Sequence, residues 1–147
     1  MVDVYTLLKA LWEGLCNGEG TIFNFLMGQG GDTLFAGCWP GSRPGSSVWN
    51  SLYYTVREFP FSTCRLVDED YEVDFTTVTT PKDRVAVIAS GPLTTNEVWT
   101  EMAKGDLYVF SGGQAYINAD EYRYHLERRN HENEHSSPPP ACLPELE

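Results

Sequence analysis

Five residues near the C-terminus have the types and spacing of a metal-dependent hydrolase motif. His131-Glu132-Asn133-Glu134-His135 fits the pattern H-E-x-x-H, in which one helical face presents two histidines to zinc and the glutamate acts as the base. A working zinc site also needs a third ligand and a rigid, partly buried helix. Here the motif follows charged residues and stops before Ser136-Ser137-Pro138-Pro139-Pro140. The sequence therefore favours incidental metal binding, predicts no metal site, and leaves a zinc hydrolase as a remote alternative.

The cysteines are the other candidate reactive groups. They are Cys16, Cys38, Cys64 and Cys142, with no C-x-x-C pair and no spacing typical of metal ligands. A nucleophilic cysteine needs a neighbouring base, and no histidine precedes His125. The first three lie in apolar segments, which favours buried structural cysteines in a reducing, cytoplasmic compartment, although a disulfide stays open. No catalytic, substrate-binding or cofactor-binding residue is predicted, and no cofactor.

Two further groups have both a functional and a structural interpretation. Asp68-Glu69-Asp70 could hold calcium, but it lacks the looped spacing of oxygen ligands and is more typical of a solvated hairpin turn. An aromatic set could line a ligand pocket, although most of it is expected to be core. Its members are Trp12, Trp39, Trp49, Tyr53, Tyr54 and Trp99.

Charge and hydropathy exclude two classes of partner. The 147 residues contain 10 Lys and Arg against 21 Asp and Glu, a formal net charge of −11. Such a chain repels phosphate backbones and has no basic stripe to offset this, so nucleic acid is not an expected partner. The longest apolar runs, such as Val85–Ala89, are far shorter than the ~20 residues of a membrane helix.

The elements that must position these groups are one helix followed by strands. Apolar residues at spacings of three and four predict a helix over Val4–Cys16, with Asp3 as its cap. From Thr21 to Ile117 the pattern is mainly extended, with a turn or short helical piece near Thr95–Met102. The expected strands are Thr21–Met27, Thr33–Trp39, Leu52–Arg57, Tyr71–Phe75, Val85–Ala89 and Leu107–Phe110. Residues 119–147 form a charged, proline-rich tail that is expected to be disordered or bound to a partner.

The segment R-V-A-V-I-A-S-G-P-L-T-T-N-E-V-W at Arg84–Trp99 resembles one branch of the class II glutamine amidotransferases, which contains ergothioneine-pathway and glutathione-degrading members. Shorter matches occur in the order expected for that family, from the first helix to about Ile117. They are Phe23-Asn24-Phe25-Leu26-Met27, Leu52-Tyr53-Tyr54, Phe59-Pro60-Phe61, Asp68-Glu69-Asp70, Val73-Asp74-Phe75, Thr79-Thr80-Pro81-Lys82-Asp83, Gly105-Asp106-Leu107 and Phe110. The family often has Glu or Gln where Gly91 stands, near the active-site cleft.

The resemblance implies an α+β fold that is part of an αββα, Ntn-hydrolase-like sandwich, with one N-terminal helix followed by a mainly antiparallel sheet. In the family an N-terminal cysteine, assisted by its own amino group, hydrolyses glutamine or a γ-glutamyl amide. That cysteine, an Asn-Gly oxyanion hole and an Arg/Asp clamp lie in the first half of the domain. Position 2 here is Val2, and none of these motifs is present. Residues 1–118 are therefore expected to be a partial amidotransferase domain that is inactive alone.

The resemblance also predicts what the chain could associate with. Part of a sandwich leaves apolar faces uncovered, and such faces find partners. The expected partner is a chain that supplies the catalytic half, or a second copy of this chain. The alternative is a non-catalytic scaffold or subunit that docks through an exposed sheet face.

Overall fold

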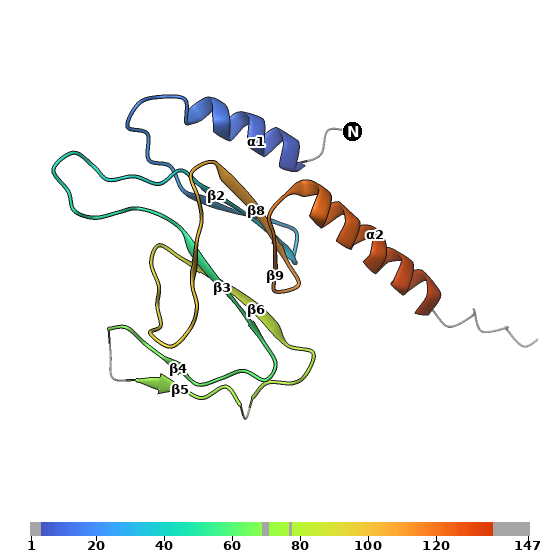
Figure 1. Cartoon of the computed structure of the whole chain (residues 1–147). Coiled ribbons are helices and arrows are strands. Elements are labelled where there is room, and N and C mark those ends of the chain that lie inside the picture. Colours follow the sequence, from blue (N-terminus) through green and yellow to red (C-terminus); the bar gives the residue numbers. More distant parts are fainter. Residues whose placement is uncertain (1–3, 69–70, 77, 137–147) are drawn as a thin grey trace, which may run out of the picture.

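The computed structural model describes residues 4–68, 71–76 and 78–136 and shows two helices and several antiparallel sheets (Figure 1). The α+β class predicted from the sequence is confirmed. In chain order the elements are α1 (Val4–Leu15), β1 (Phe25–Gln29), β2 (Thr33–Cys38), β3 (Tyr53–Glu58), β4 (Cys64–Arg65), β5 (Glu72–Val73), β6 (Arg84–Ala89), β7 (Thr100–Glu101), β8 (Asp106–Ser111), β9 (Gln114–Tyr116) and α2 (Ala119–Ser136).

Helix α1 forms where the apolar spacing predicts it and packs on a four-stranded sheet of order β1-β2-β8-β9. Trp12 is the anchor: it is 2% exposed and packs with Phe35 of β2 and Val109 of β8. Its indole ring meets Trp39 edge-on at 5.7 Å between ring centroids. Burying an aromatic side chain of this size stabilises the helix on the sheet more than helix propensity does.

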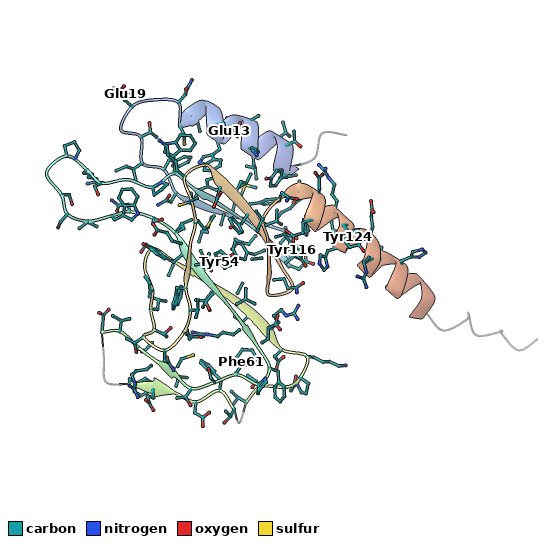
Figure 2. The ribbon with its side chains drawn as sticks, in the orientation of Figure 1. Glu13, Glu19, Tyr54, Phe61, Tyr116 and Tyr124 are labelled. Atoms are coloured by element: carbon teal, nitrogen blue, oxygen red, sulfur yellow. The ribbon has the colours of Figure 1, made fainter. Side chains whose placement is uncertain are left out.

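A second sheet, of order β6-β3-β7, packs on the opposite face of the first. Alternation along β8 explains this, because Val109 faces α1 while Tyr108 and Phe110 face the second sheet. Tyr54 of β3 fills the space between the sheets, with its ring 5.5 Å from that of Phe110 (Figure 2). The described layers are thus helix, sheet and sheet.

Strand β6 lies at an edge of the second sheet. It pairs over its whole length with β3, from Tyr53↔Ala89 to Glu58↔Arg84, and in the described part of the chain it has no ladder on its other side. The turn between β8 and β9 contacts Arg84, the first residue of β6. Gly113 has φ +74°, and a Cβ there would lie 2.3 Å from the carbonyl oxygen of Arg84, so only glycine fits this contact.

Helix α2 begins inside the segment that the sequence predicts as a tail. Asn118 caps it, accepting the backbone N–H of Glu121 at 2.8 Å, while the Glu121 carboxylate accepts the backbone N–H of Ile117 at 3.0 Å. This is close to a capping box. A hydrogen bond of 2.9 Å between the hydroxyls of Tyr122 and Thr33 ties the first turn to β2. Positions 137–147 of the expected tail lie outside the described residues.

The expected turn or short helical piece at Thr95–Met102 contains no helix. Its backbone bonds instead with distant segments, Thr95 N–H with the carbonyl of Arg65 at 3.0 Å and Met102 N–H with that of Leu52 at 2.9 Å. These partners are remote in sequence, so local pattern does not reveal them. Neither helix, over the residues described, is long and apolar enough to span a bilayer.

Candidate functional site

The Ser90-Gly91-Pro92 segment leaves the end of β6 on the surface of the second sheet. Gly91 has open space around its Cα, so its lack of a side chain is not imposed by packing. The chain after it is fastened to the β4 region: Val67 N–H donates to the carbonyl of Leu93 at 3.0 Å. The residues that follow, Thr94 to Trp99, turn back across the sheet.

A partly buried ion pair holds this returning segment on β3. The Arg57 guanidinium donates from Nε to Glu97 Oε1 at 2.7 Å and from Nη2 to Oε2 at 2.8 Å. The two side chains are only 19% and 9% exposed. This bidentate geometry is the strongest arrangement that the two groups can adopt. It joins residues 40 positions apart in the sequence.

Neutral groups extend the pair into a network. The Thr94 hydroxyl donates to Glu97 Oε2 at 2.5 Å, and Trp99 Nε1 donates to the Thr94 oxygen at 2.9 Å. Beside them, Asn96 accepts the backbone N–H of Arg65 at 2.8 Å. The motif T-T-N-E-V-W therefore works as a clasp that fixes the chain beyond the end of β6.

The electrostatics make this clasp structural rather than reactive. Hydrogen bonds from Arg57 hold the pKa of Glu97 below its ordinary value, against the opposing effect of burial. The same contact raises the pKa of Arg57. Both Glu97 oxygens already accept donors, so this carboxylate stays ionised and is poorly placed to take a proton from a substrate.

A polar cleft of about 270 Å³ lies beside the clasp, and Phe61 marks its position (Figure 2). Arg57 and Glu97 contribute to its wall, but their charges neutralise each other. The ring of Phe75 lies 5.4 Å from the Arg57 guanidinium and supports it further. Glu58 adds a further carboxylate to the cleft, and its described walls contain no histidine or cysteine.

The three described cysteines are buried and unpaired. Cys16, Cys38 and Cys64 are 1%, 0% and 2% exposed, and burial raises the pKa of each thiol. Cys38 lies 3.6 Å from the Ser51 hydroxyl and 3.5 Å from the carbonyl of Met102. All three have the environment of inert core thiols. Cys142 lies outside the described residues.

The remaining candidates from the sequence do not assemble into a described metal centre. The H-E-x-x-H segment continues α2, with His131 exposed, whereas the side chains of Glu132 and His135 lie outside the described part. Asp68 sits in the connection of the β4–β5 hairpin, whose Glu69-Asp70 is likewise outside it. Among the residues that are described, no three His, Cys, Asp or Glu side chains are grouped to hold an ion.

The aromatic set divides between core and surface. Trp12 is buried, and Tyr54 packs between the sheets. Trp49 is 52% exposed and donates from its ring nitrogen to Glu101 at 2.7 Å. These residues lie in different parts of the fold, so the set as a whole does not line one pocket.

A second surface, here named the α1–β1 groove, is apolar. It measures about 290 Å³ and lies between the helix and the edge strand β1. Leu11, Leu15 and Leu26 are 63%, 60% and 51% exposed there. The indole nitrogen of Trp12 is buried and has no acceptor within the described chain. The groove is lined by Leu8, Leu11, Trp12, Leu15, Phe23, Phe25, Leu26 and Met27.

Comparisons with known proteins point to one family. Residues 2–135 match the family model described as class-II glutamine amidotransferases. A protein of Escherichia coli K12 named "Putative glutamine amidotransferase YafJ" is 40% identical over 67 residues, which are 46% of this chain and 26% of that protein. A Haemophilus influenzae Rd protein named "Putative glutamine amidotransferase" is 29% identical over 113 residues, which are 77% of this chain and 34% of that one.

A solved structure agrees with these matches. The crystal structure of a predicted glutamine amidotransferase from Pseudomonas aeruginosa PA01 superposes with a TM-score of 0.57 and 36% sequence identity. The likeness covers 80% of this chain and 43% of that one. The chain thus spans about a third or less of the two bacterial relatives and under half of the solved structure.

Proposed function

This chain belongs to the class II glutamine amidotransferases, and we propose that residues 1–147 form the strand-rich supporting part of such a domain and hydrolyse no glutamine by themselves. The observation that carries the proposal is the state of the thiols. The family reaction uses a cysteine nucleophile, and the described cysteines are buried with raised pKa values. A buried, protonated thiol attacks an amide poorly.

The supporting role has a physical basis in the clasp. The resemblance implies that the end of β6 lies near the active-site cleft of the family, and the Arg57–Glu97 pair holds the chain that leaves this end. A rigid strand end is what a cleft assembled from two halves of a domain needs. The chain's contribution to catalysis is therefore positional: it supplies one wall of the cleft, and the nucleophile, oxyanion hole and glutamine clamp come from elsewhere.

An assay of the purified chain with glutamine tests this directly. We expect glutamate and ammonia to stay at the level of the buffer blank. Hydrolysis above the blank that persists after chelation, and that a Cys64→Ser variant removes, would overturn the proposal. The matched positive control adds the upstream half of the Pseudomonas aeruginosa relative. Glutamine hydrolysis is expected to appear in it if this chain supplies an intact wall of the cleft.

The α1–β1 groove favours a second proposal, in which the chain acts as a subunit. Leucines along the outer side of α1 and on β1 are more than half exposed, in a chain with otherwise abundant surface charge. An exposed apolar surface of this kind often marks a binding site for another protein segment. The proposed occupant is the chain segment that supplies the catalytic half.

Light scattering with a paired variant tests the docking role. Leu11→Glu places a charge in the groove, while Val98→Glu places one at an 87% exposed position on another surface. Association with the catalytic half, or with a second copy, should be lost in the first variant and kept in the second. A wild-type chain that stays monomeric and ignores the added half would count against docking.

Two lesser expectations remain proposals. The three unpaired cysteines favour a reducing compartment such as the cytoplasm. A zinc hydrolase built on the α2 motif is the remote alternative; absence of stoichiometric zinc in the purified chain, or no effect of His131→Ala, would dispose of it.

A further inference from the structure

A cavity of about 400 Å³ lies between α2, the β8–β9 turn and the start of β6. Figure 2 shows Tyr116 of β9, which lines this cavity, beside the first turns of α2. It is at the opposite end of β6 from Ser90-Gly91-Pro92, roughly 17 Å away along a six-residue strand. Nothing in the proposed amidotransferase role uses it.

The walls of this cavity are basic, in a protein whose net charge is −11. Arg84, His125 and Arg128 line it together with the amide of Gln114, and the described lining contains no acidic side chain. Arg84 is bonded to Glu58 at 3.0 Å, but the two side chains are 36% and 54% exposed. An ion pair that exposed is weak, so an incoming anion can compete for the guanidinium.

An unpartnered hydroxyl provides independent evidence for a ligand. Ser111 lines the cavity and is 6% exposed, yet its Oγ is buried with no hydrogen-bond partner in the described chain. Strand alternation puts its side chain on the same face of β8 as Val109, the face that the helices cover. A buried hydroxyl without a partner costs free energy, and a ligand oxygen would remove that cost.

The cavity is also built in advance. The close approach of Gly113 to the Arg84 carbonyl fixes the β8–β9 turn against β6. The Tyr122–Thr33 hydrogen bond fixes the first turn of α2, and the His125 ring lies 4.8 Å from the ring of Tyr116. The basic groups therefore come from elements that are already docked. A ligand would therefore lose little free energy to the ordering of side chains and loops, which favours binding.

We propose that this cavity binds a small organic anion through one oxyanion group, a phosphate or a carboxylate, held by Arg84 and Arg128 and by the hydroxyl of Ser111. The guanidinium fork suits both groups. The rings of Tyr116 and Tyr122 offer an apolar wall for the body of the ligand. This binding is independent of glutamine hydrolysis, so its failure and the failure of the amidotransferase proposal are separate results.

Calorimetric titration of the full chain at low ionic strength tests the proposal, with inorganic phosphate, citrate and adenosine monophosphate as probes. At least one probe should bind saturably, and the preferred one identifies the source of the oxyanion. Arg128→Gln should weaken that binding about tenfold. Arg65→Gln is the matched control, because Arg65 pairs with Glu72 on the remote β4–β5 hairpin, and it should leave affinity unchanged.

A second variant separates a ligand site from a structural role. Ser111→Ala removes a hydroxyl without a partner, so it should weaken binding several-fold while the melting temperature stays the same or rises. Circular dichroism checks that each variant is folded. The proposal is overturned if none of the three probes binds, if Arg65→Gln weakens binding as much as Arg128→Gln does, or if Ser111→Ala lowers the melting temperature without changing affinity.

Discussion

Removing the charge of Glu97 should destabilise the protein more than a conservative change at any other ion pair among the described residues. Glu97→Gln keeps the shape of the side chain but leaves the Arg57 guanidinium facing a neutral amide. In the native chain the carboxylate accepts two N–H groups from Arg57 and one O–H from Thr94. The variant therefore weakens three hydrogen bonds at once, in a place where water can only partly replace them.

The size of the effect follows from the burial of the pair. Breaking a buried ion pair costs about 3–5 kcal/mol. Because the Arg57 side chain keeps 19% exposure and can reach some water, we expect the lower end, about 3 kcal/mol. With a urea dependence of about 2 kcal/mol per M, the unfolding midpoint should fall by about 1.5 M.

Urea unfolding, followed by tryptophan fluorescence, measures this shift. Arg65→Gln is the control, since the side chains of Arg65 and Glu72 are 62% and 53% exposed and such a pair contributes less than about 1 kcal/mol. The double variant Arg57→Met/Glu97→Leu should regain stability relative to Glu97→Gln, because no charge is left unpaired. A Glu97→Gln midpoint no lower than that of the control would refute the reasoning.

The pKa of Glu97 is lowered in the folded chain, so the stability contributed by its carboxylate is complete above the unfolded pKa and is lost as pH falls through the folded pKa. The difference in free energy of unfolding between wild type and Glu97→Gln should therefore hold from pH 7 to about 5 and narrow below about 4.5. Gly113→Ala should lower the melting temperature and cost more than about 1 kcal/mol, because of its positive φ and the Arg84 carbonyl, whereas Gly91→Ala, which meets open space, serves as the control and should change little. At most one of the four thiols should react with Ellman's reagent in the native chain, and all four in urea; a second fast thiol would contradict the buried state of Cys16, Cys38 and Cys64.

The sequence predicts helix α1 and the longer strands of this fold well, because their signals are local. The apolar stripe of α1 and the β-branched run of β6 each carry their own period. Strands β4, β5 and β7 are only two residues long and exist through pairings such as Cys64↔Val73 and Tyr54↔Thr100. Two residues are too few to show a period, and the partner of β7 is remote in sequence, so periodicity cannot find these strands.

The clasp shows the same limit for the candidate site. The T-T-N-E-V-W motif can be recognised, but the partner of Glu97 cannot, because Arg57 lies 40 residues earlier in a strand of ordinary composition. The start of α2 is different, since Asn118 and Glu121 have the spacing of a helix cap and a local signal was present. Predicting the basic cavity would have required both the start of α2 and the position of the β8–β9 turn that faces it.

The single-sided pairing of β6 has a consequence for amide exchange. Along a strand that bonds on one side, alternate N–H groups point away from the ladder, so about half of the β6 amides should exchange with deuterium far faster than their neighbours. A strand from another chain that extended the sheet at this edge would slow those amides selectively, while a partner seated in the α1–β1 groove would leave them fast. The exchange pattern of one strand therefore distinguishes growth of the sheet from cover of the helix.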